Sequence, residues 1–357
     1  MVLDASTGQL ASESPALLHA LEGRAFAASI KAEITQSMIE VNSGIHASAD
    51  SLEAELREIC ASLCDAAAGQ GLALSGGGAH PFRDWPQRDI FPDKRFVRLQ
   101  GVYGYLVKQF TVFGQHVHVG VTSADDAIYL THVFNCFVPH FVALTASSPF
   151  QRGVDTDFHS SRVNVISMFP LNGQLPDVRD WREFEAYFLR MQRTGLVRTM
   201  KDLYWDARPK PEFGTVELRA CDMPLTVTHA ADIAALCQTI ARCYLDQRPR
   251  LNTALQHEIC AVNRFKAAKS AWDATILDVE SDRPVSLAES TASLIDRCLP
   301  YCDCRGAADR LQRLGRRVAA RSTDADWIRE IMGRNCDWAH LLIAQSARLL
   351  EPAEAAG

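Results

Sequence analysis

The sequence lacks the short motifs that mark several large enzyme classes. It contains no GxGxxG fingerprint, no GxSxG nucleophile elbow and no HExxH zinc motif. The glycine-rich stretch SGGGAHPF, residues 75–82, lacks the Gly-Lys-Ser/Thr ending of a P-loop. These absences count against Rossmann dehydrogenases, α/β-hydrolases, zincin proteases and P-loop nucleotidases.

The chain also lacks an excess of positive charge. Its 357 residues include 37 basic and 43 acidic ones, which gives a net charge of -6. This balance carries no electrostatic footprint for nucleic acid, so no such partner is expected. No apolar run approaches about 20 residues, and MVLDASTGQL lacks the basic start of a secretory signal. The expectation is a cytoplasmic protein without a membrane-spanning helix.

The 11 cysteines do not form a recognisable disulfide framework. An odd number at irregular spacing in a long chain without a secretory signal fits reduced thiols. Cys298, Cys302 and Cys304 cluster, but a structural zinc site usually takes four ligands and no fourth stands nearby. We interpret these cysteines as structural or incidental.

Helices and strands are interleaved without an internal repeat. Long helical segments separate the strands, but there is no regular βαβ alternation. This order favours an α+β fold with helices packed on an antiparallel sheet. Residues from about 287 to 350 read as two or three helices. We see no linker and predict a single domain over residues 1–357.

Three helix starts stand out. Asp50, with Glu53 three residues later, predicts a capping box. Ser123 predicts the start of a long apolar helix that reaches about residue 145. Asp180 predicts a further helix, which Gly195 ends.

The stretch FGQHVHVGV, residues 113–121, carries two histidines in a predicted strand. Because side chains alternate along a strand, His116 and His118 share one face and the valines share the other. Gly114 and Gly120 are expected to leave open space beside the imidazoles. A hydrogen-bonded structural pair and a pair of metal ligands both fit this pattern.

A second predicted strand, GTVELRACD, places Glu217 and Arg219 on one face. A cross-strand ion pair is one interpretation, since such pairs are common and weakly stabilising. The other is a metal-binding carboxylate beside a phosphate-binding arginine.

Two further segments carry charged candidates. In KAEITQSMIEVNSG, residues 36–42 read as strand, and a turn near Glu33 would let it reach the same site as Glu40. Exposed surface glutamates are the alternative. In NRFKAAKSAWDATILD, helical spacing puts Lys266 and Lys269 on one face beside Arg264. A solvated basic face is the alternative here.

Taken together, five segments resemble one family in the same order, from about residue 3 to 350. GGGAHPF resembles its GTHPF turn, FGQHVHVGV its CHVHVG strand, and LTASSPFQRGVDTDFHSSR its LSASSPF…G.DTG…SYR segment. YWDARPKPEFGTVELRACDMP resembles its YWDVRPS…TVEVRVCD strand, and NRFKAAKSAWDATILD its NRWRAARYGLDA helix. The family is that of the carboxylate-amine ligases counted as type 2 glutamate–cysteine ligases.

The resemblance implies a glutamine-synthetase-like catalytic fold, in which a curved antiparallel sheet forms a funnel with helices on its outer face. It implies ATP and Mg²⁺ as cofactors and a weak synthesis of γ-glutamylcysteine, the chemistry of glutathione biosynthesis, with glutamate and cysteine or another amine as substrates. Hard divalent cations would let the negative triphosphate approach a carboxylate. The residues carried over are Glu33, Glu40, Glu217, His116 and His118 for metal, Arg219, Arg162 and Arg208 for catalysis and substrate carboxylates, and Arg264, Lys266 and Arg219 for the nucleotide.

One departure concerns the start of the chain. The family begins with a GxExE strand whose glutamates also bind metal, and VLDASTGQL resembles the segment that comes after that strand. The expectation is therefore a site without that inner strand and with an unpaired sheet edge. A non-catalytic nucleotide- or amino-acid-binding relative, and a metal-dependent hydrolase built on His116 and His118, are the alternatives. A homodimer is the oligomeric state considered.

Overall fold

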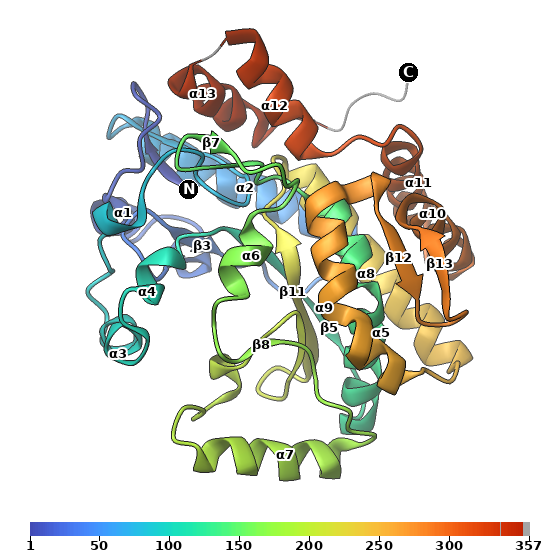
Figure 1. Cartoon of the computed structure of the whole chain (residues 1–357). Coiled ribbons are helices and arrows are strands. Elements are labelled where there is room, and N and C mark those ends of the chain that lie inside the picture. The colour runs from blue at the N-terminus through green and yellow to red at the C-terminus, as the bar shows by residue number, and fades with distance from the viewer. Residues whose placement is uncertain (336, 353–357) are drawn as a thin grey trace.

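The computed structural model describes residues 1–335 and 337–352 and is shown in Figure 1. Its helices are α1 Ser14–Leu21, α2 Ala49–Ala68, α3 Lys94–Tyr103, α4 Leu106–Gln109, α5 Ala124–Thr145, α6 Arg162–Ile166, α7 Trp181–Arg193, α8 Val227–Gln247, α9 Thr253–Ser270, α10 Leu287–Cys298, α11 Arg305–Ala319, α12 Asp324–Asn335 and α13 Trp338–Arg348. Its strands are β1 Val2–Asp4, β2 Ile30–Ala32, β3 Ile39–Val41, β4 Leu72–Leu74, β5 Gly114–Gly120, β6 Phe150–Gln151, β7 Val154–Asp155, β8 Asn172–Gly173, β9 Tyr204–Trp205, β10 Ala207–Lys210, β11 Thr215–Asp222, β12 Thr275–Asp278 and β13 Arg283–Ser286.

An antiparallel sheet in the order β10–β11–β5 lies at the centre of the molecule (Figure 1). Across it, Arg208 stands opposite Glu217, and Glu217 stands opposite His118. The register shifts between Leu218 and Cys221, so β11 carries an irregularity there. Such a bulge bends a strand and re-aims its side chains.

Helices α5 and α8 pack on the face of this sheet that carries the apolar side chains. Val117 of β5 and Leu218 of β11 belong to the same buried cluster as Phe134 of α5 and Ile240 of α8. Burying a side chain of this size contributes about 1.5–3 kcal/mol. Apolar side chains on one face and polar ones on the other therefore set the orientation of the sheet, and the predicted α+β architecture is confirmed.

Helix α5 is the segment that bears on the sequence-based expectation about membranes. It is long and apolar enough to span a bilayer by length and composition, although no such segment was expected. Within the protein, 89% of its most apolar window is buried. The central helix of a protein core has the same composition, and α5 packs against the sheet and against α9.

Two of the predicted local features differ in detail. The cap of α2 is Ser48, whose side chain accepts the backbone N–H of Ser51, rather than Asp50. Asp50 instead accepts two hydrogen bonds from Arg310 of α11, because a distant arginine competes for its carboxylate. The strand predicted at residues 36–42 is shorter and covers only Ile39–Val41. The predicted caps Ser123 and Asp180 are confirmed.

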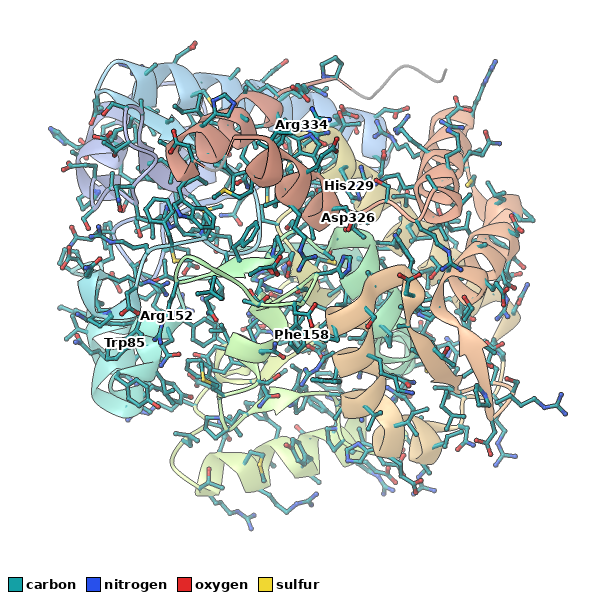
Figure 2. All side chains as sticks on the ribbon, turned by 45° about the horizontal axis from the view of Figure 1, so that its top comes forward. Trp85, Arg152, Phe158, His229, Asp326 and Arg334 are labelled. Carbon is teal, nitrogen blue, oxygen red and sulfur yellow. The ribbon has the colours of Figure 1, made fainter. Side chains whose placement is uncertain are left out.

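The segment after residue 287 forms four helices, α10 to α13, rather than two or three. Asp324, at the start of α12, accepts hydrogen bonds from the backbone of Leu225 and from Arg317. Asp326 of α12, labelled with Phe158 in Figure 2, lies 3.6 Å from Nδ1 of His159, and Arg329 donates to the Phe158 carbonyl at 2.9 Å. Hydrogen bonds and ion pairs thus dock α12 on the loop between β7 and α6.

His80 joins two turns near the N-terminus. Its Nδ1 accepts the backbone N–H of Arg83 at 3.0 Å, and its Nε2 donates to the carbonyl of Gly8 at 2.9 Å. This pattern requires a neutral imidazole, and burial lowers the pKa of His80 to about 4. An unfolded histidine protonates near pH 6.5. The contribution of His80 to stability is therefore complete above that pH and is lost as the pH falls toward 4.

We expect His80→Ala to lower the free energy of unfolding by about 2–3 kcal/mol at pH 7.5, because it removes two buried hydrogen bonds and leaves a cavity. At pH 4.5 the difference from the wild type should shrink by about 2 kcal/mol. Urea unfolding at both pH values measures this, with the exposed His19→Ala as control. A difference that does not change with pH would contradict this role of His80.

Candidate active site

The two histidines of β5 lie on the open face of the central sheet. Their side chains are 36% and 35% exposed, whereas Val117 between them is buried in the core. Glu217 reaches the same face from β11. Its Oε1 lies 3.5 Å from Nδ1 of His116 and 4.0 Å from Nε2 of His118. The structure therefore brings Glu217 next to the two histidines that alternation placed on one face of their strand.

Two arginines hold Glu217 in place. Nε of Arg208 donates to Oε2 at 2.7 Å, and Nη1 of Arg219 donates to Oε1. Glu217 is only 3% exposed. Burial alone would raise the pKa of its carboxyl group, but Arg219 and Arg208 lower that pKa well below its usual range. Glu217 is thus ionised at neutral pH and shares its charge with two guanidinium groups.

Both imidazoles are held in their neutral form. Burial lowers the pKa of His116 well below its usual range, and the charge of Arg219 lowers it further. Burial also lowers the pKa of His118. Nδ1 of His118 lies 2.9 Å from the hydroxyl of Thr215, so its Nε2 faces Glu217. Neutral imidazole is the form that binds metal ions.

The donor types at this face fit a divalent cation only in part. Among residues 1–335 and 337–352 no group of three or more histidine, cysteine or carboxylate side chains is already arranged as a metal site. Arg219 occupies Oε1 of Glu217, the oxygen that faces both histidines, and would have to release it. Mg²⁺ prefers oxygen ligands, so the carboxylates fit it better than the imidazoles.

Glu33 and Glu40 form a second acidic group. The turn before β3 brings the two carboxyl groups together, and burial and the charge of Glu40 raise the pKa of Glu33 to about 7. The amide of Asn42 donates to Glu40 at 2.7 Å. Two carboxyl groups that share a confined space repel each other, and a cation between them would remove that repulsion.

The surroundings of this acidic group include Arg95 of α3. The charge of Arg95 acts on the pKa of Glu33, and the charges of Arg219 and Arg95 both act on that of Tyr204. That Glu33 and the Arg219 region belong to one site stays a prediction.

Gly114 is not beside open space, contrary to the sequence-based expectation. A methyl group at Gly114 would lie 2.2 Å from Nη2 of Arg162. The Arg162 side chain is buried there and donates to the carbonyls of Ala220 at 3.3 Å and Arg219 at 3.2 Å. Gly120, in contrast, has no atom within 4 Å of where its side chain would be. The open space therefore lies only at the Gly120 end.

Gly114→Ala is expected to destabilise the protein by about 1–3 kcal/mol, because the new methyl group overlaps a buried guanidinium. Gly120→Ala, with free space around it, is the matched control and should change stability by less than about 0.5 kcal/mol. Thermal unfolding followed by circular dichroism compares the two. Equal melting temperatures would contradict the close packing of Arg162 on Gly114.

Arg162 and Arg208, which the family resemblance suggested as substrate contacts, use most of their donors inside the protein. Nη1 of Arg208 donates to the carbonyls of Met200 and Leu203, both at 2.7 Å. Both arginine side chains are almost fully buried. In this arrangement they hold the polar side chains and the backbone of the sheet in place, and direct contact with a substrate stays a prediction.

Asp222 is a functional candidate that the sequence did not single out. Its carboxylate accepts hydrogen bonds from the backbone of Ser147 at 3.1 Å and from the hydroxyls of Ser148 and Ser160 at 2.7 and 2.8 Å. A side chain at Gly78 would overlap it, at 2.5 Å. The glycines of SGGG therefore permit close packing on Asp222. In the sequence, only the serines of ALTASSPF indicated that hydrogen-bond donors would gather around this carboxylate.

Arg264 of α9 also points to the site. Its guanidinium donates to Asp206 at 2.7 Å, and the carbonyl of Asp206 accepts the backbone N–H of Arg219 at 2.7 Å. Lys269 instead pairs with Asp157, and Lys266 is exposed. Arg264 is thus linked to β11, while the nucleotide roles of Arg264 and Lys266 stay predictions.

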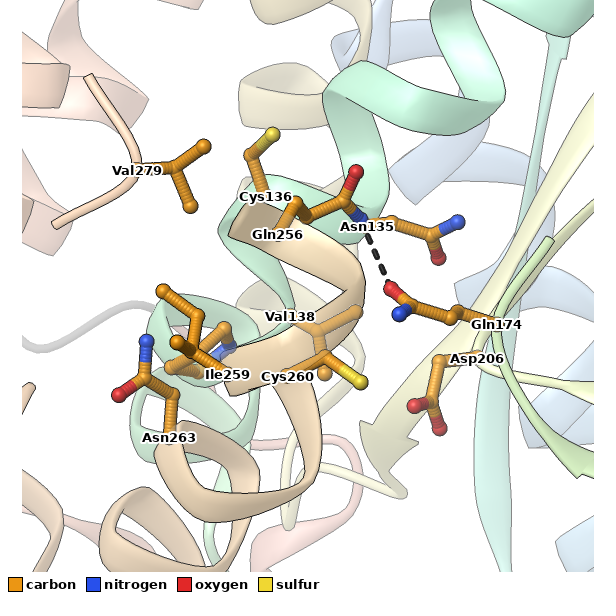
Figure 3. Close-up of a pocket in the computed structure, with 11 residues that line it drawn as sticks. Asn135, Cys136, Val138, Gln174, Asp206, Gln256, Ile259, Cys260, Asn263 and Val279 are labelled. Atoms are coloured by element: carbon orange, nitrogen blue, oxygen red, sulfur yellow. Dashed lines mark hydrogen bonds between the residues drawn. The ribbon is translucent and has the colours of Figure 1, made fainter. Parts of the chain in front are cut away.

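A small polar cavity lies behind Asp206, between α5 and α9 (Figure 3). Gln256 donates to Gln174 at 2.9 Å across it, and the buried amide of Asn135 has no hydrogen-bond partner among the described residues. Its volume of about 10 Å³ is close to that of one solvent molecule. This cavity is too small for a substrate.

The sequence matches a family model described as glutamate-cysteine ligase family 2 (GCS2) over residues 1–344. A protein of Ralstonia pickettii named "Putative glutamate–cysteine ligase 2" is 45% identical over 323 residues, which cover 90% of this chain and 85% of that protein. A protein of Legionella pneumophila named "Putative glutamate–cysteine ligase 2-2" is 40% identical over 347 residues, 96% of this chain and 90% of that one.

Two solved structures share the fold. The glutamate–cysteine ligase of Francisella tularensis in complex with AMP superposes with a TM-score of 0.71 at 14% identity, covering 98% of this chain and 86% of that one. A bifunctional glutathione synthetase of Pasteurella multocida gives 0.67 at 11% identity, covering 97% and 49%. The sheet, the positions of its polar side chains and these similarities lead to one conclusion: the chain belongs to glutamate–cysteine ligase family 2.

Proposed function

We propose that this protein is an ATP- and Mg²⁺-dependent carboxylate-amine ligase that joins glutamate to cysteine. A carboxylate oxygen of glutamate attacks the γ-phosphorus of ATP, and the bond to the bridging oxygen of ADP breaks. The amino group of cysteine then attacks the acyl phosphate, phosphate leaves, and the amine loses a proton to solvent. The observation that carries the proposal is the meeting of Glu217, Arg219 and His116 on one open sheet face.

The residues of this chain have separate tasks in such a reaction. Glu33, Glu40 and Glu217 would each supply carboxylate oxygens to divalent cations, which supply charge neutralisation between triphosphate and carboxylate when bound. Arg219, which is less buried than Arg208, can turn from Glu217 toward a phosphoryl oxygen. Arg208 keeps Glu217 ionised and oriented. Asp206 orients Arg264, the candidate for nucleotide contact.

His116→Ala is expected to raise the Mg²⁺ concentration needed for half-maximal rate by about 10-fold, in line with the loss of one ligand or of its support. His118→Ala should have a smaller effect, because its ring lies further from Glu217. Metal titrations of the initial rate measure both. An unchanged titration for His116→Ala would count against a role in metal binding.

Coupled ADP release tests the proposal. With ATP, Mg²⁺, glutamate and cysteine we expect one ADP for each γ-glutamylcysteine, and no product when ATP or Mg²⁺ is left out. Replacing cysteine by other amino acids or by polyamines identifies the acceptor amine. ADP release that does not depend on any amine or on glutamate would contradict the ligase assignment.

A non-catalytic nucleotide-binding relative is the second candidate. The observation that favours it is the double ion pair of Glu217, whose two oxygens are already engaged by Arg208 and Arg219. In that case calorimetry would detect ATP binding while no acyl phosphate could be trapped. We place the protein in the cytoplasm with small-molecule substrates, and light scattering tests whether it forms the predicted homodimer.

A further inference from the structure

A second, larger cavity lies away from the candidate active site. Its volume is about 420 Å³, within the range of about 300–1,000 Å³ typical of small-molecule sites. It is bounded by α5, the end of α8, residues 249–252 and the β12–β13 hairpin. In Figure 1 the β12–β13 hairpin lies to the right of α9, whereas β11 lies to the left of α9. No residue predicted for catalysis or for metal binding is among those that line it.

The lining of this cavity has an excess of negative charge. Arg297 donates to both oxygens of Glu280, at 2.7 and 2.9 Å, so these two groups neutralise each other. The remaining charged groups are Asp278 and Asp282 against Arg250. The lining thus holds two further carboxylates and one exposed guanidinium.

Aromatic rings form the opposite wall. Phe137 of α5 packs edge-to-face on Tyr244 at 5.4 Å and on His140 at 5.3 Å, and Ile276 adds a buried aliphatic surface. Burial, together with the charges of Glu280 and Asp278, raises the pKa of the neighbouring Cys136 thiol to about 12. The negative potential therefore extends to the aromatic wall, where ring faces also favour cations.

The carboxylates sit on a short and well-ordered loop. Oδ2 of Asp278 accepts the backbone N–H and the hydroxyl of Ser281, both at 2.7 Å, and its carbonyl accepts the N–H of Asp282 at 2.9 Å. Asn263 fixes the same hairpin to α9 through two hydrogen bonds to Leu277. A site that is held in place before binding loses less entropy when a ligand binds.

We propose that this cavity is a binding site for a small organic cation with a primary ammonium group on an aromatic or aliphatic body. The ammonium group lies against the carboxylates of Asp278 and Asp282, which supply acceptors for its three donors. The apolar body lies against Phe137 and Tyr244. The site is separate from the site of the proposed ligase reaction and does not depend on that reaction.

Calorimetry of the full chain with three matched probes tests this proposal. We expect 2-phenylethylamine to bind at least about 10-fold more tightly than 2-phenylethanol or 3-phenylpropionate, which share its body but not its charge. The Asp278→Asn/Asp282→Asn variant should lose at least about 10-fold in affinity for the amine. Asp309→Asn, a surface change on α11, is the control.

Three results would overturn the proposal. One is the absence of saturable amine binding up to about 10 mM. Another is equal or tighter binding of the carboxylate or the alcohol. The third is amine binding that is the same in the double variant and in Asp309→Asn, with both variants folded by circular dichroism. None of these readouts uses enzymatic activity, so they are independent of the ligase proposal.

Discussion

Glu217→Ala is expected to abolish ATP-dependent amide formation, with kcat lowered by at least about 10³-fold. Glu217 is the carboxylate closest to both histidines and the group on which Arg208 and Arg219 converge. Its removal leaves the nearly buried Arg208 without a counter-charge, which is expected to destabilise the protein by about 3–5 kcal/mol. Coupled ADP release, measured at a temperature at which the variant is folded, gives the effect on kcat. Thermal unfolding gives the effect on stability.

Glu217→Gln separates chemistry from folding. The amide keeps the shape of the side chain and should retain more stability, while its loss of charge should still remove most of the activity. Glu185→Ala is the control, since Glu185 is an exposed carboxylate on α7. Activity near the wild-type level in Glu217→Gln would contradict the assigned role.

Asp222→Ala is expected to destabilise the protein by about 3–5 kcal/mol, as much as Glu217→Ala. The change would leave two serine hydroxyls and a backbone N–H without their acceptor, and it would remove the carboxylate that faces Arg162 at 3.8 Å. Asp222→Asn places an amide N–H₂ group among donors and should lose about 1–3 kcal/mol. Urea unfolding measures both variants, with the exposed Asp309→Asn as control. A loss below about 1 kcal/mol for Asp222→Ala would contradict this network.

The sequence predicted the features that depend on short-range rules. Alternation placed His116 and His118 on one face of their strand and Glu217 and Arg219 on one face of another, because the side-chain period of a strand is fixed by backbone geometry. Ser123 and Asp180 were recognised as helix caps, because a short polar side chain accepts the free N–H groups of the first turn. The fold was predicted from the family motifs, which occur in the same order in this sequence.

Contacts between distant segments could not be predicted in this way. The space beside Gly114 is filled by Arg162, which comes 48 residues later on another element (162 minus 114). Asp50 lost its predicted capping role because Arg310, on a helix far along the chain, binds its carboxylate. Ser48 then caps the helix instead. Such outcomes depend on which side chains the packing of distant elements brings together.

The surroundings of Glu33 and Glu40 were also only partly predictable from the sequence. The sequence indicated that a turn near Glu33 would allow it to join Glu40, and the structure brings the two carboxyl groups together. It gave no sign that the charge of Arg95 would act on the pKa of Glu33, or that of Arg219 on the pKa of Tyr204. Arg95 and Tyr204 come from α3 and β9, and only the packing of those elements brings them within range of these charges.

Trapping of the acyl phosphate with hydroxylamine tests the central claim most directly. With ATP, Mg²⁺ and glutamate but without cysteine, we expect γ-glutamyl hydroxamate and one ADP for each hydroxamate. Both products should disappear when EDTA is added and when Glu217→Gln replaces the wild type. Hydroxamate that forms without ATP, or that forms equally in Glu217→Gln, would contradict the claim that this sheet face activates a carboxylate by phosphoryl transfer.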